Sequence, residues 1–181
     1  MNETRQVLLC GLGGQGVVLA GRLLGAAGFT EGLEVSGTSS YGAAARGGQC
    51  RSEVVLSSGA IGFPFVTHAD VLVALSQSAY ARYITWTRSP DGVVFYDPAD
   101  VEPAVDVVQK HIAVPASDTA QHILGSRLGA NIVMLGAVAG AENLVSRESL
   151  EAVVKERSPR RFREQNLLAL DAGLALAPGL Q

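Results

Sequence analysis

The residues most suited to chemistry form the glycine-rich hexapeptide GLGGQG at positions 11–16, between the apolar runs VLLC and VVLA. Gly11, Gly13 and Gly16 have the spacing of a dinucleotide-binding turn, which leads from a strand into a helix. We expect Gly11 to permit a tight turn, Gly13 a close backbone approach and Gly16 close packing of helix on strand. The amides of Gly13, Gly14, Gln15 and Gly16 are then expected to point outward at the helix start, where a phosphate is favoured.

A nicotinamide cofactor also requires an acidic residue at the carboxyl end of the second strand, about 20 residues further on. Glu34 has the approximate spacing, but it comes early in the predicted strand 33–36, and Ser36, Gly37 and Thr38 occupy the end of that strand. Free dinucleotide binding is therefore one hypothesis for this turn. Glycines that serve tight packing alone are the other, and the residues leave both open.

A second candidate segment, SSYGAAARGGQ at residues 39–49, joins the second and third predicted strands. It is expected to lie at the same carboxyl edge of the sheet as the glycine turn. Arg46 offers a planar, permanently charged fork beside the bare backbone of Gly47 and Gly48, which suits a phosphate, a carboxylate or an acidic group of a partner. Ser40 and Tyr41 belong to the same candidate loop. The alternative is a surface turn with a solvated arginine.

The elements that must position these loops follow from the apolar patterning. Several strand-like runs are apolar throughout, which is typical of strands buried on both faces in a parallel sheet. Strands are predicted at 6–10, 33–36, 51–56, 71–75, 93–96 and 111–114, and helices at 16–27, 78–86, 119–128, 131–140, 147–157 and 161–176. Their alternation predicts a three-layer α/β fold, with a mostly parallel, Rossmann-like sheet flanked by helices.

Composition narrows the class of protein. The 181 residues, 48% of them hydrophobic, suit a single domain over 1–181 with one sizeable core. A net charge of -3 gives no electrostatic footprint for nucleic acid, so no nucleic-acid partner is expected. No stretch reaches the roughly 18 apolar residues of a membrane span, and the start MNETR lacks the pattern of a secretory signal. We therefore expect a cytoplasmic protein without a membrane partner.

Cysteines and histidines are too few and too scattered for a metal centre in this chain. Cys10 and Cys50 lie 40 positions apart without a Cys-x-x-Cys motif, so an iron–sulfur cluster would have to come from another subunit. Reduced, buried thiols are expected rather than a disulfide. The three histidines, His68, His111 and His122, lack the close helical pairing of metal ligands, and no metal site is predicted.

Taken together, several motifs resemble the gamma subunit of 2-oxoacid:ferredoxin oxidoreductases of the 2-oxoglutarate or pyruvate type. The motifs are the G-x-G-G-Q-G-V turn with its helix, SYGAAARGG, the strand RSEVVLS and the later segment ADVLVAL. The resemblance spans most of the chain. The indolepyruvate enzymes contain an equivalent subunit, which is kept as an alternative alongside a free-standing dinucleotide-binding protein.

The resemblance implies an enzyme that decarboxylates a 2-oxoacid, here 2-oxoglutarate by preference, on thiamine diphosphate. Such an enzyme passes electrons through iron–sulfur clusters to ferredoxin and delivers the acyl group to coenzyme A. Thiamine diphosphate, magnesium and the clusters are expected in alpha and beta subunits, and in a ferredoxin-like delta subunit where one is present. No cofactor is expected to bind this chain tightly, and the isolated chain is expected to be inactive.

The role left for this chain is to complete and seal a site. The amides of residues 13–16 and the guanidinium of Arg46 are candidates for lining the entrance of coenzyme A or for supporting the thiamine subunits. They would supply positioning and exclusion of water rather than acid–base groups. No catalytic residue is predicted, and homodimerisation of the isolated chain is left open.

Overall fold

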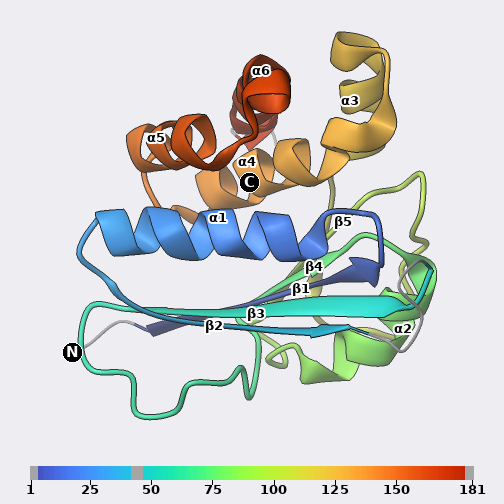
Figure 1. The fold of residues 1–181 in the computed structure, drawn as a ribbon. Helices are drawn as coiled ribbons and strands as arrows, with labels where there is room; N and C mark the ends of the chain where they lie inside the picture. Colours follow the sequence, from blue (N-terminus) through green and yellow to red (C-terminus); the bar gives the residue numbers. More distant parts are fainter. Residues whose placement is uncertain (1–3, 42–46, 178–181) are drawn as a thin grey trace.

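A six-stranded sheet forms the centre of the computed structural model, which describes residues 4–41 and 47–177 (Figure 1). Its strands lie in the order β2-β3-β1-β4-β5-β6. They are β1 (Thr4–Leu12), β2 (Glu34–Tyr41), β3 (Gln49–Ser57), β4 (Val71–Ala74), β5 (Val93–Tyr96) and β6 (Lys110–Ala113). Every predicted strand is present, and the ends of β1, β3, β4 and β6 differ from the prediction by one or two residues.

The predicted mostly parallel sheet is confirmed. The pairs β1–β4, β4–β5 and β5–β6 are parallel, whereas β3 lies antiparallel to both of its neighbours, β1 and β2. Because β3 is antiparallel to both neighbours, β2 runs in the same direction as β1. The carboxyl ends of these two strands therefore meet at one edge of the sheet, where the two candidate loops begin.

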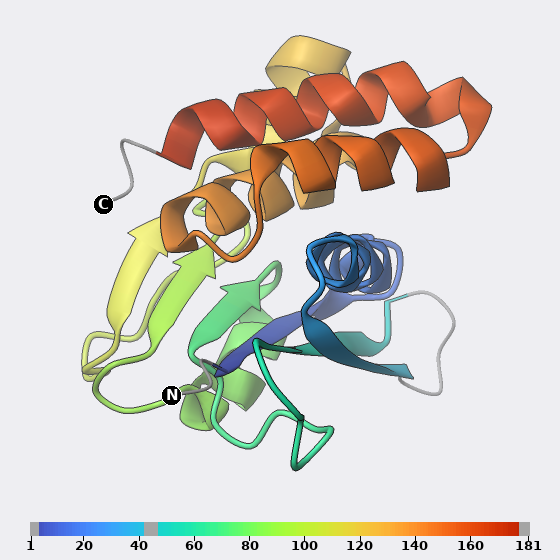
Figure 2. The same cartoon turned by 90° about the vertical axis from the view of Figure 1, so that its left-hand side faces the viewer.

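Helices cover the two faces of the sheet unequally. Helices α1, α4, α5 and α6 lie over one face, with α3 beside them, and α2 lies under the other (Figures 1 and 2). The helices are α1 (Val17–Thr30), α2 (Gln77–Tyr83), α3 (Ala116–Leu124), α4 (Ala130–Glu142), α5 (Arg147–Arg157) and α6 (Arg163–Leu176), with short 3-10 turns at 84–86, 127–129 and 160–162. Within the described ranges, none of these helices has the length and apolarity that crossing a membrane demands.

Strand β1 shows why the strand runs are apolar throughout. Val7 and Leu9 pack into the cluster under α1 and α4, whereas Leu8 and Cys10 pack into the cluster around α2. All four side chains are at most 2% exposed. Each fully buried Val or Leu contributes about 1.5–3 kcal/mol of hydrophobic stabilisation. The central strand therefore holds both layers of helices on the sheet.

Two predicted boundaries were wrong in ways that affect the site. The second strand, predicted at 33–36, continues to Tyr41 because its residues pair with β3 along their whole length, from Glu34 opposite Ser57 to Tyr41 opposite Cys50. The helix predicted at 119–128 instead occupies 116–124. It starts earlier because the Asp97 carboxylate accepts a hydrogen bond from the amide of Ser117 in its first turn, a contact from a distant segment.

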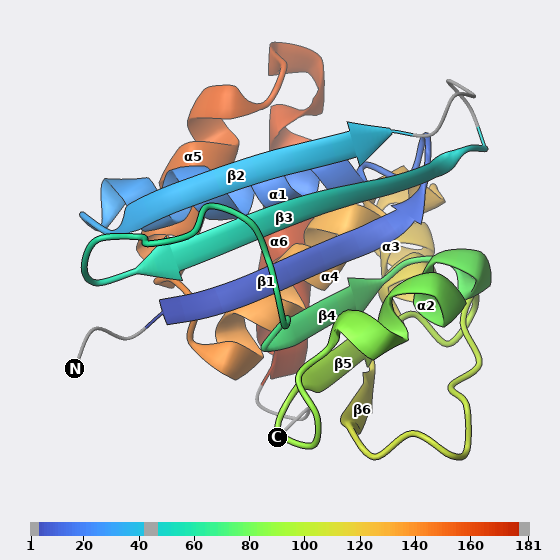
Figure 3. The same cartoon turned by 90° about the horizontal axis from the view of Figure 1, so that it is seen from below.

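The lower face of the sheet at β2 and β3 is crossed by the connection 58–70 rather than by a helix (Figure 3). The buried carboxylate of Glu53 fixes this connection, because its Oε2 accepts a hydrogen bond of 3.0 Å from the amide of Val66. Its Oε1 lies 2.9 Å from Nε of Arg51, and the guanidinium of Arg51 lies 4.8 Å from the ring centre of Trp86. One carboxylate thus joins β3, the connection and the packing around α2.

Replacing Glu53 by alanine should lower the free energy of unfolding by about 2–3 kcal/mol, because the variant leaves a largely buried arginine and a buried amide without their partner. Ser36→Ala is the control, since it removes an exposed hydrogen bond from Ser36 Oγ to the carbonyl of Pro64 on the same connection. That variant should change stability by less than about 0.5 kcal/mol. Urea unfolding of both variants tests this, and equal losses would contradict the assignment.

Candidate functional site

The glycine turn connects β1 to α1 through left-handed backbone at Gly14 and Gly16, whose φ angles are 103° and 74°. Gly16 also lies against α4. A Cβ there would come within 2.3 Å of Nδ2 of Asn131, and this Nδ2 donates a hydrogen bond of 3.2 Å to the carbonyl of Gly16. The predicted close approach at Gly16 is therefore to a side chain of α4 rather than to a strand.

The prediction that Gly11 forms the tight turn was wrong. Gly11 lies inside β1, opposite Cys50 of β3, and a Cβ there would lie 2.6 Å from Oε1 of Gln15 and 3.0 Å from Val17. It therefore permits the close packing of α1 and the turn on the strand, which was expected of Gly16. The turn itself falls on Gly14 and Gly16.

The side chain of Gln15 links the turn to the neighbouring parallel strand. Its Oε1 accepts a hydrogen bond of 2.6 Å from the amide of Leu12, at the end of β1. Its Nε2 donates one of 2.6 Å to the carbonyl of Leu75, directly after β4. After β1 the chain turns to one face of the sheet and after β4 to the other, so Gln15 spans the point where the two departing segments separate.

Two of the four amides expected to point outward are bonded within the chain. The amide of Gly13 donates to the carbonyl of Gly48 at 2.8 Å, and that of Gln15 donates to the carbonyl of Leu12 at 3.1 Å. The expected phosphate cradle is therefore wrong for these two positions. Glu34 is the first residue of β2 and lies at the opposite edge of the sheet from the turn, so it cannot serve as the ribose-binding acid.

The two candidate loops are joined to each other, which confirms their predicted meeting at one edge. Gly13 and the segment 47–48 exchange two backbone hydrogen bonds, since the amide of Gly47 also donates to the carbonyl of Gly13 at 3.4 Å. Ser40 and Tyr41, predicted in the loop, are instead the last two residues of β2, and both are exposed. Residues 42–46, which include Arg46, lie outside the described part of the chain.

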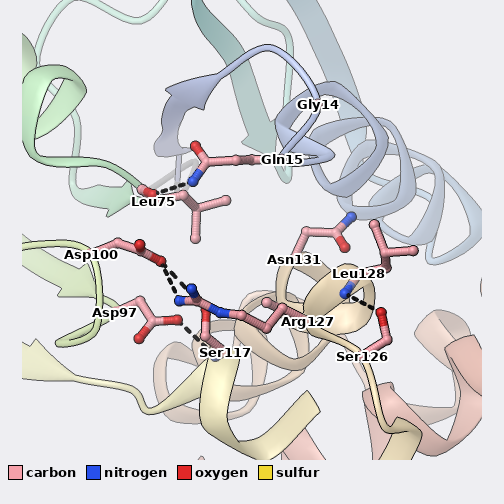
Figure 4. Close-up of a pocket in the computed structure, with 11 residues that line it drawn as sticks. Gly14, Gln15, Leu75, Asp97, Asp100, Ser117, Ser126, Arg127, Leu128 and Asn131 are labelled. Atoms are coloured by element: carbon pink, nitrogen blue, oxygen red, sulfur yellow. Dashed lines mark hydrogen bonds and ion pairs between the residues drawn. The ribbon is translucent and has the colours of Figure 1, made fainter. Parts of the chain in front are cut away.

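A pocket of about 310 Å³ opens beside the glycine turn (Figure 4). It lies past the carboxyl ends of β1, β4 and β5, the position where open α/β sheets bind ligands. Its walls come from the turn, from the segments after β4 and β5, and from the starts of α3 and α4. The lining residues are Gly14, Gln15, Leu75, Asp97, Asp100, Ser117, Ser126, Arg127, Leu128, Ala130 and Asn131.

The charged side chains of this pocket are paired with each other or with the backbone. Asp97 is 2% exposed, and its two oxygens accept hydrogen bonds from the amides of Ala99 at 3.1 Å and Ser117 at 2.7 Å. Asp100 lies 2.9 Å from Nη2 of Arg127, which reaches toward it across the pocket in Figure 4. An anionic ligand could engage Arg127 in competition with Asp100.

Four of the lining residues were not predicted from the sequence: Asp97, Asp100, Arg127 and Asn131. Asp97 carried a usable signal, because it directly follows the predicted strand 93–96 at the carboxyl edge. Arg127 and Asn131 carried none, since only the packing of α4 against the turn brings them to this edge. The lining residues include no histidine, cysteine or lysine, and both aspartates are engaged, Asp97 by backbone amides and Asp100 by Arg127. The pocket therefore offers hydrogen bonds and shape to a ligand.

The cysteines do not suit an iron–sulfur cluster. Both thiols are free and buried, as expected, and they belong to clusters on opposite faces of the sheet. Burial raises the pKa of Cys10 and of Cys50, which disfavours the thiolate that binds iron. In the ranges 4–41 and 47–177, no three histidine, cysteine or acidic side chains gather as a metal site would require. No redox step is therefore assigned to these residues.

These features define an α/β module in which a glycine turn and a second loop meet at the carboxyl ends of the strands. Residues 6–176 match the model for pyruvate ferredoxin/flavodoxin oxidoreductase, and the chain belongs to this family.

A curated relative of similar length is the 2-oxoglutarate synthase subunit KorC of Methanocaldococcus jannaschii. It is 41% identical over 97% of this chain and 95% of its own. Among solved structures, the gamma subunit of a keto/oxoacid ferredoxin oxidoreductase from Geobacter sulfurreducens is 32% identical, with a TM-score of 0.84 over 97% of this chain and 99% of that one.

A second solved structure is the 2-oxoglutarate:ferredoxin oxidoreductase of Magnetococcus marinus with 2-oxoglutarate, coenzyme A and succinyl-CoA bound. The alignment has a TM-score of 0.88 and 26% identity, and it covers 99% of this chain and 32% of that one. The whole module described above thus corresponds to about a third of a longer oxidoreductase chain. The curated homologues are subunits of 2-oxoacid:ferredoxin oxidoreductases, as the motifs predicted.

Gln15→Leu should lower the free energy of unfolding by about 2–3 kcal/mol, because it leaves the amide of Leu12 and the carbonyl of Leu75 without their partner. Gln77→Leu is the matched control. The side chain of Gln77 likewise makes two hydrogen bonds to the backbone, since its Nε2 donates to the carbonyl of Glu102 and its Oε1 accepts from the amide of Glu102, but it is exposed. We expect that variant to lose less than about 1 kcal/mol in urea unfolding. Equal losses would show that Gln15 is not a central link.

Both thiols should resist alkylation in the native protein, because their burial and raised pKa withhold the reactive thiolate. The measurement is mass spectrometry after iodoacetamide treatment at pH 8, for a time that fully alkylates the chain in urea. Native protein should stay unmodified at Cys10 and Cys50. Rapid native modification of either residue would contradict the assignment.

Proposed function

We propose that this chain is the gamma-type subunit of a 2-oxoacid:ferredoxin oxidoreductase whose substrate is 2-oxoglutarate. The observation that carries the proposal is the 41% identity to a 2-oxoglutarate synthase subunit along nearly the full length of both chains. The complex would convert the 2-oxoacid to its acyl-CoA and reduce ferredoxin. We infer that residues 1–181 act as one domain, and that the chain works in the cytoplasm, where its reduced thiols are stable.

Within such a complex, the redox chemistry belongs to other subunits. We assign thiamine diphosphate, magnesium and the iron–sulfur clusters to alpha and beta partners, and to a ferredoxin-like delta subunit where one is present. Support comes from the two buried thiols, whose pKa is raised and which face opposite sides of the sheet, and from a pocket whose two aspartates are already bonded to the backbone and to Arg127.

This chain contributes a rigid polar surface at the carboxyl ends of its strands, where the glycine turn and the second loop meet. The bonds of Gln15 and of Gly13 fix the glycine turn to β4 and to the second loop, so the turn can meet a ligand or a neighbouring subunit without rearranging. Gly14 is the exposed point of the turn, and the pocket with Arg127 opens next to it. We propose that coenzyme A, a large anionic co-substrate, or the subunit that holds it, contacts this surface.

Anaerobic purification of the tagged chain from its native cells tests this function. We expect partner chains to co-purify with the absorbance of iron–sulfur clusters and with dye reduction that depends on 2-oxoglutarate and coenzyme A. A panel of 2-oxoacids, including pyruvate and indolepyruvate, distinguishes the alternative enzymes of the family. A colourless protein without partners that retains NAD or FAD would instead support the dinucleotide-binding alternative.

Arg46→Ala in the purified complex should raise the KM for coenzyme A about tenfold or weaken assembly, because it removes a permanent positive charge from the second loop. Arg160→Ala is the control, since Arg160 is exposed on the 3-10 turn before α6. Steady-state kinetics with varied coenzyme A measure the effect, and gel filtration measures assembly. Unchanged kinetics together with unchanged assembly would rule out a role for Arg46.

A further inference from the structure

The two edges of the sheet differ in how well they are protected. Strand β6 is four residues long and carries Lys110 and His111, with Pro115 soon after it, and such features block the addition of another strand. Strand β2 is eight residues long and follows the straight register of β3 from Glu34 to Tyr41. Between Val35 and Tyr41 it carries no charge, no proline and no bulge. An edge of this kind is normally covered in the functional protein.

A groove of about 480 Å³ runs along this edge between β2 and α1. Small residues of α1 and β2 form much of its floor, among them Gly21, Gly25, Gly37 and Ser39. Arg22 of α1 and Arg157 at the end of α5 also line it. Among the described residues, neither arginine takes part in an ion pair, and the groove lining contains no carboxylate.

We propose that β2 takes an extended, acidic segment of a partner subunit as a seventh strand of the sheet. The backbone of that segment would satisfy the outward N–H and C=O groups of β2. Alternate side chains of an added strand point to the same face, so every second residue of the segment would face α1. Acidic residues at those positions would meet Arg22 and Arg157 over the groove. The inference rests on the proposed function only in requiring partner subunits.

A second copy of this chain suits the edge less well. Antiparallel pairing of two β2 strands about a twofold axis would place the helices of both copies on the same side of the joined sheet. Four arginines would then gather over two grooves that hold no carboxylate, because Glu34, the one acidic residue of β2, alternates with the groove residue Val35 and lines a different pocket. Like charges at such a contact are repulsive. An acidic segment removes this repulsion.

Hydrogen exchange measured by mass spectrometry compares the isolated chain with the chain in the purified complex. Amides of 34–41 that are not bonded to β3 should exchange quickly in the isolated chain and at least about tenfold more slowly in the complex. Unchanged exchange of 34–41 in a complex that contains partners and activity would overturn the β2 proposal alone. A chain that purifies without partners would overturn the proposed function as well.

Charge reversal tests the acidic character of the occupant. Arg22→Glu with Arg157→Glu should lower the recovery of partner chains about tenfold, with an unchanged Tm of the isolated chain. Lys110→Glu with Arg160→Glu makes the same change in net charge at residues that do not line the groove, and it should leave recovery unchanged. Equal recovery of partner chains with both double variants would overturn the proposal that the bound segment is acidic. Slow exchange of residues 34–41 in a purified homodimer would show that a second copy of this chain, rather than an acidic partner segment, covers β2.

Discussion

The hydrogen bonds of the Gln15 side chain are the constraint on which the candidate site depends. They tie the end of β1 to the residue after β4, at the point where the chain leaves the sheet toward opposite faces. With this link in place, the turn holds Gly13 against the second loop and Gly16 against Asn131 of α4. The wall of the pocket and the polar surface are therefore parts of one hydrogen-bonded unit.

The distribution of charge explains why such a unit suits assembly. Acidic and basic groups in the pocket are already paired, as Asp100 is with Arg127, and the buried thiols are held protonated. By contrast, Arg22 and Arg157 over the groove take part in no ion pair among the described residues, and the end of β2 is exposed. The charged groups of the pocket and the buried thiols are thus held in unreactive states. Hydrogen-bonding groups and positive charge are instead exposed along β2 and its groove, where another chain can bind them.

The sequence predicted the α/β class, every strand and the meeting of the two loops, because apolar runs and glycine spacing are local signals. It failed where a distant segment decides the outcome. Two amides of the glycine turn donate hydrogen bonds to the carbonyls of Gly48 and Leu12, so they are not free for a ligand. Strand β2 is extended to Tyr41 by its pairing with β3. Arg127 and Asn131 reach the site only through the packing of α4. Local spacing contains no information about these contacts.

Photo-crosslinking tests most directly whether the sheet edge that carries both loops faces the rest of an oxidoreductase. Benzoylphenylalanine in place of Tyr41, which is 63% exposed at the end of β2, should crosslink to a partner chain in the active complex. The same group in place of Phe29, which is 74% exposed near the end of α1 at the opposite edge, should not. Crosslinking to a partner from position 29 but not from position 41 would show that the opposite edge of the sheet faces the partner chains.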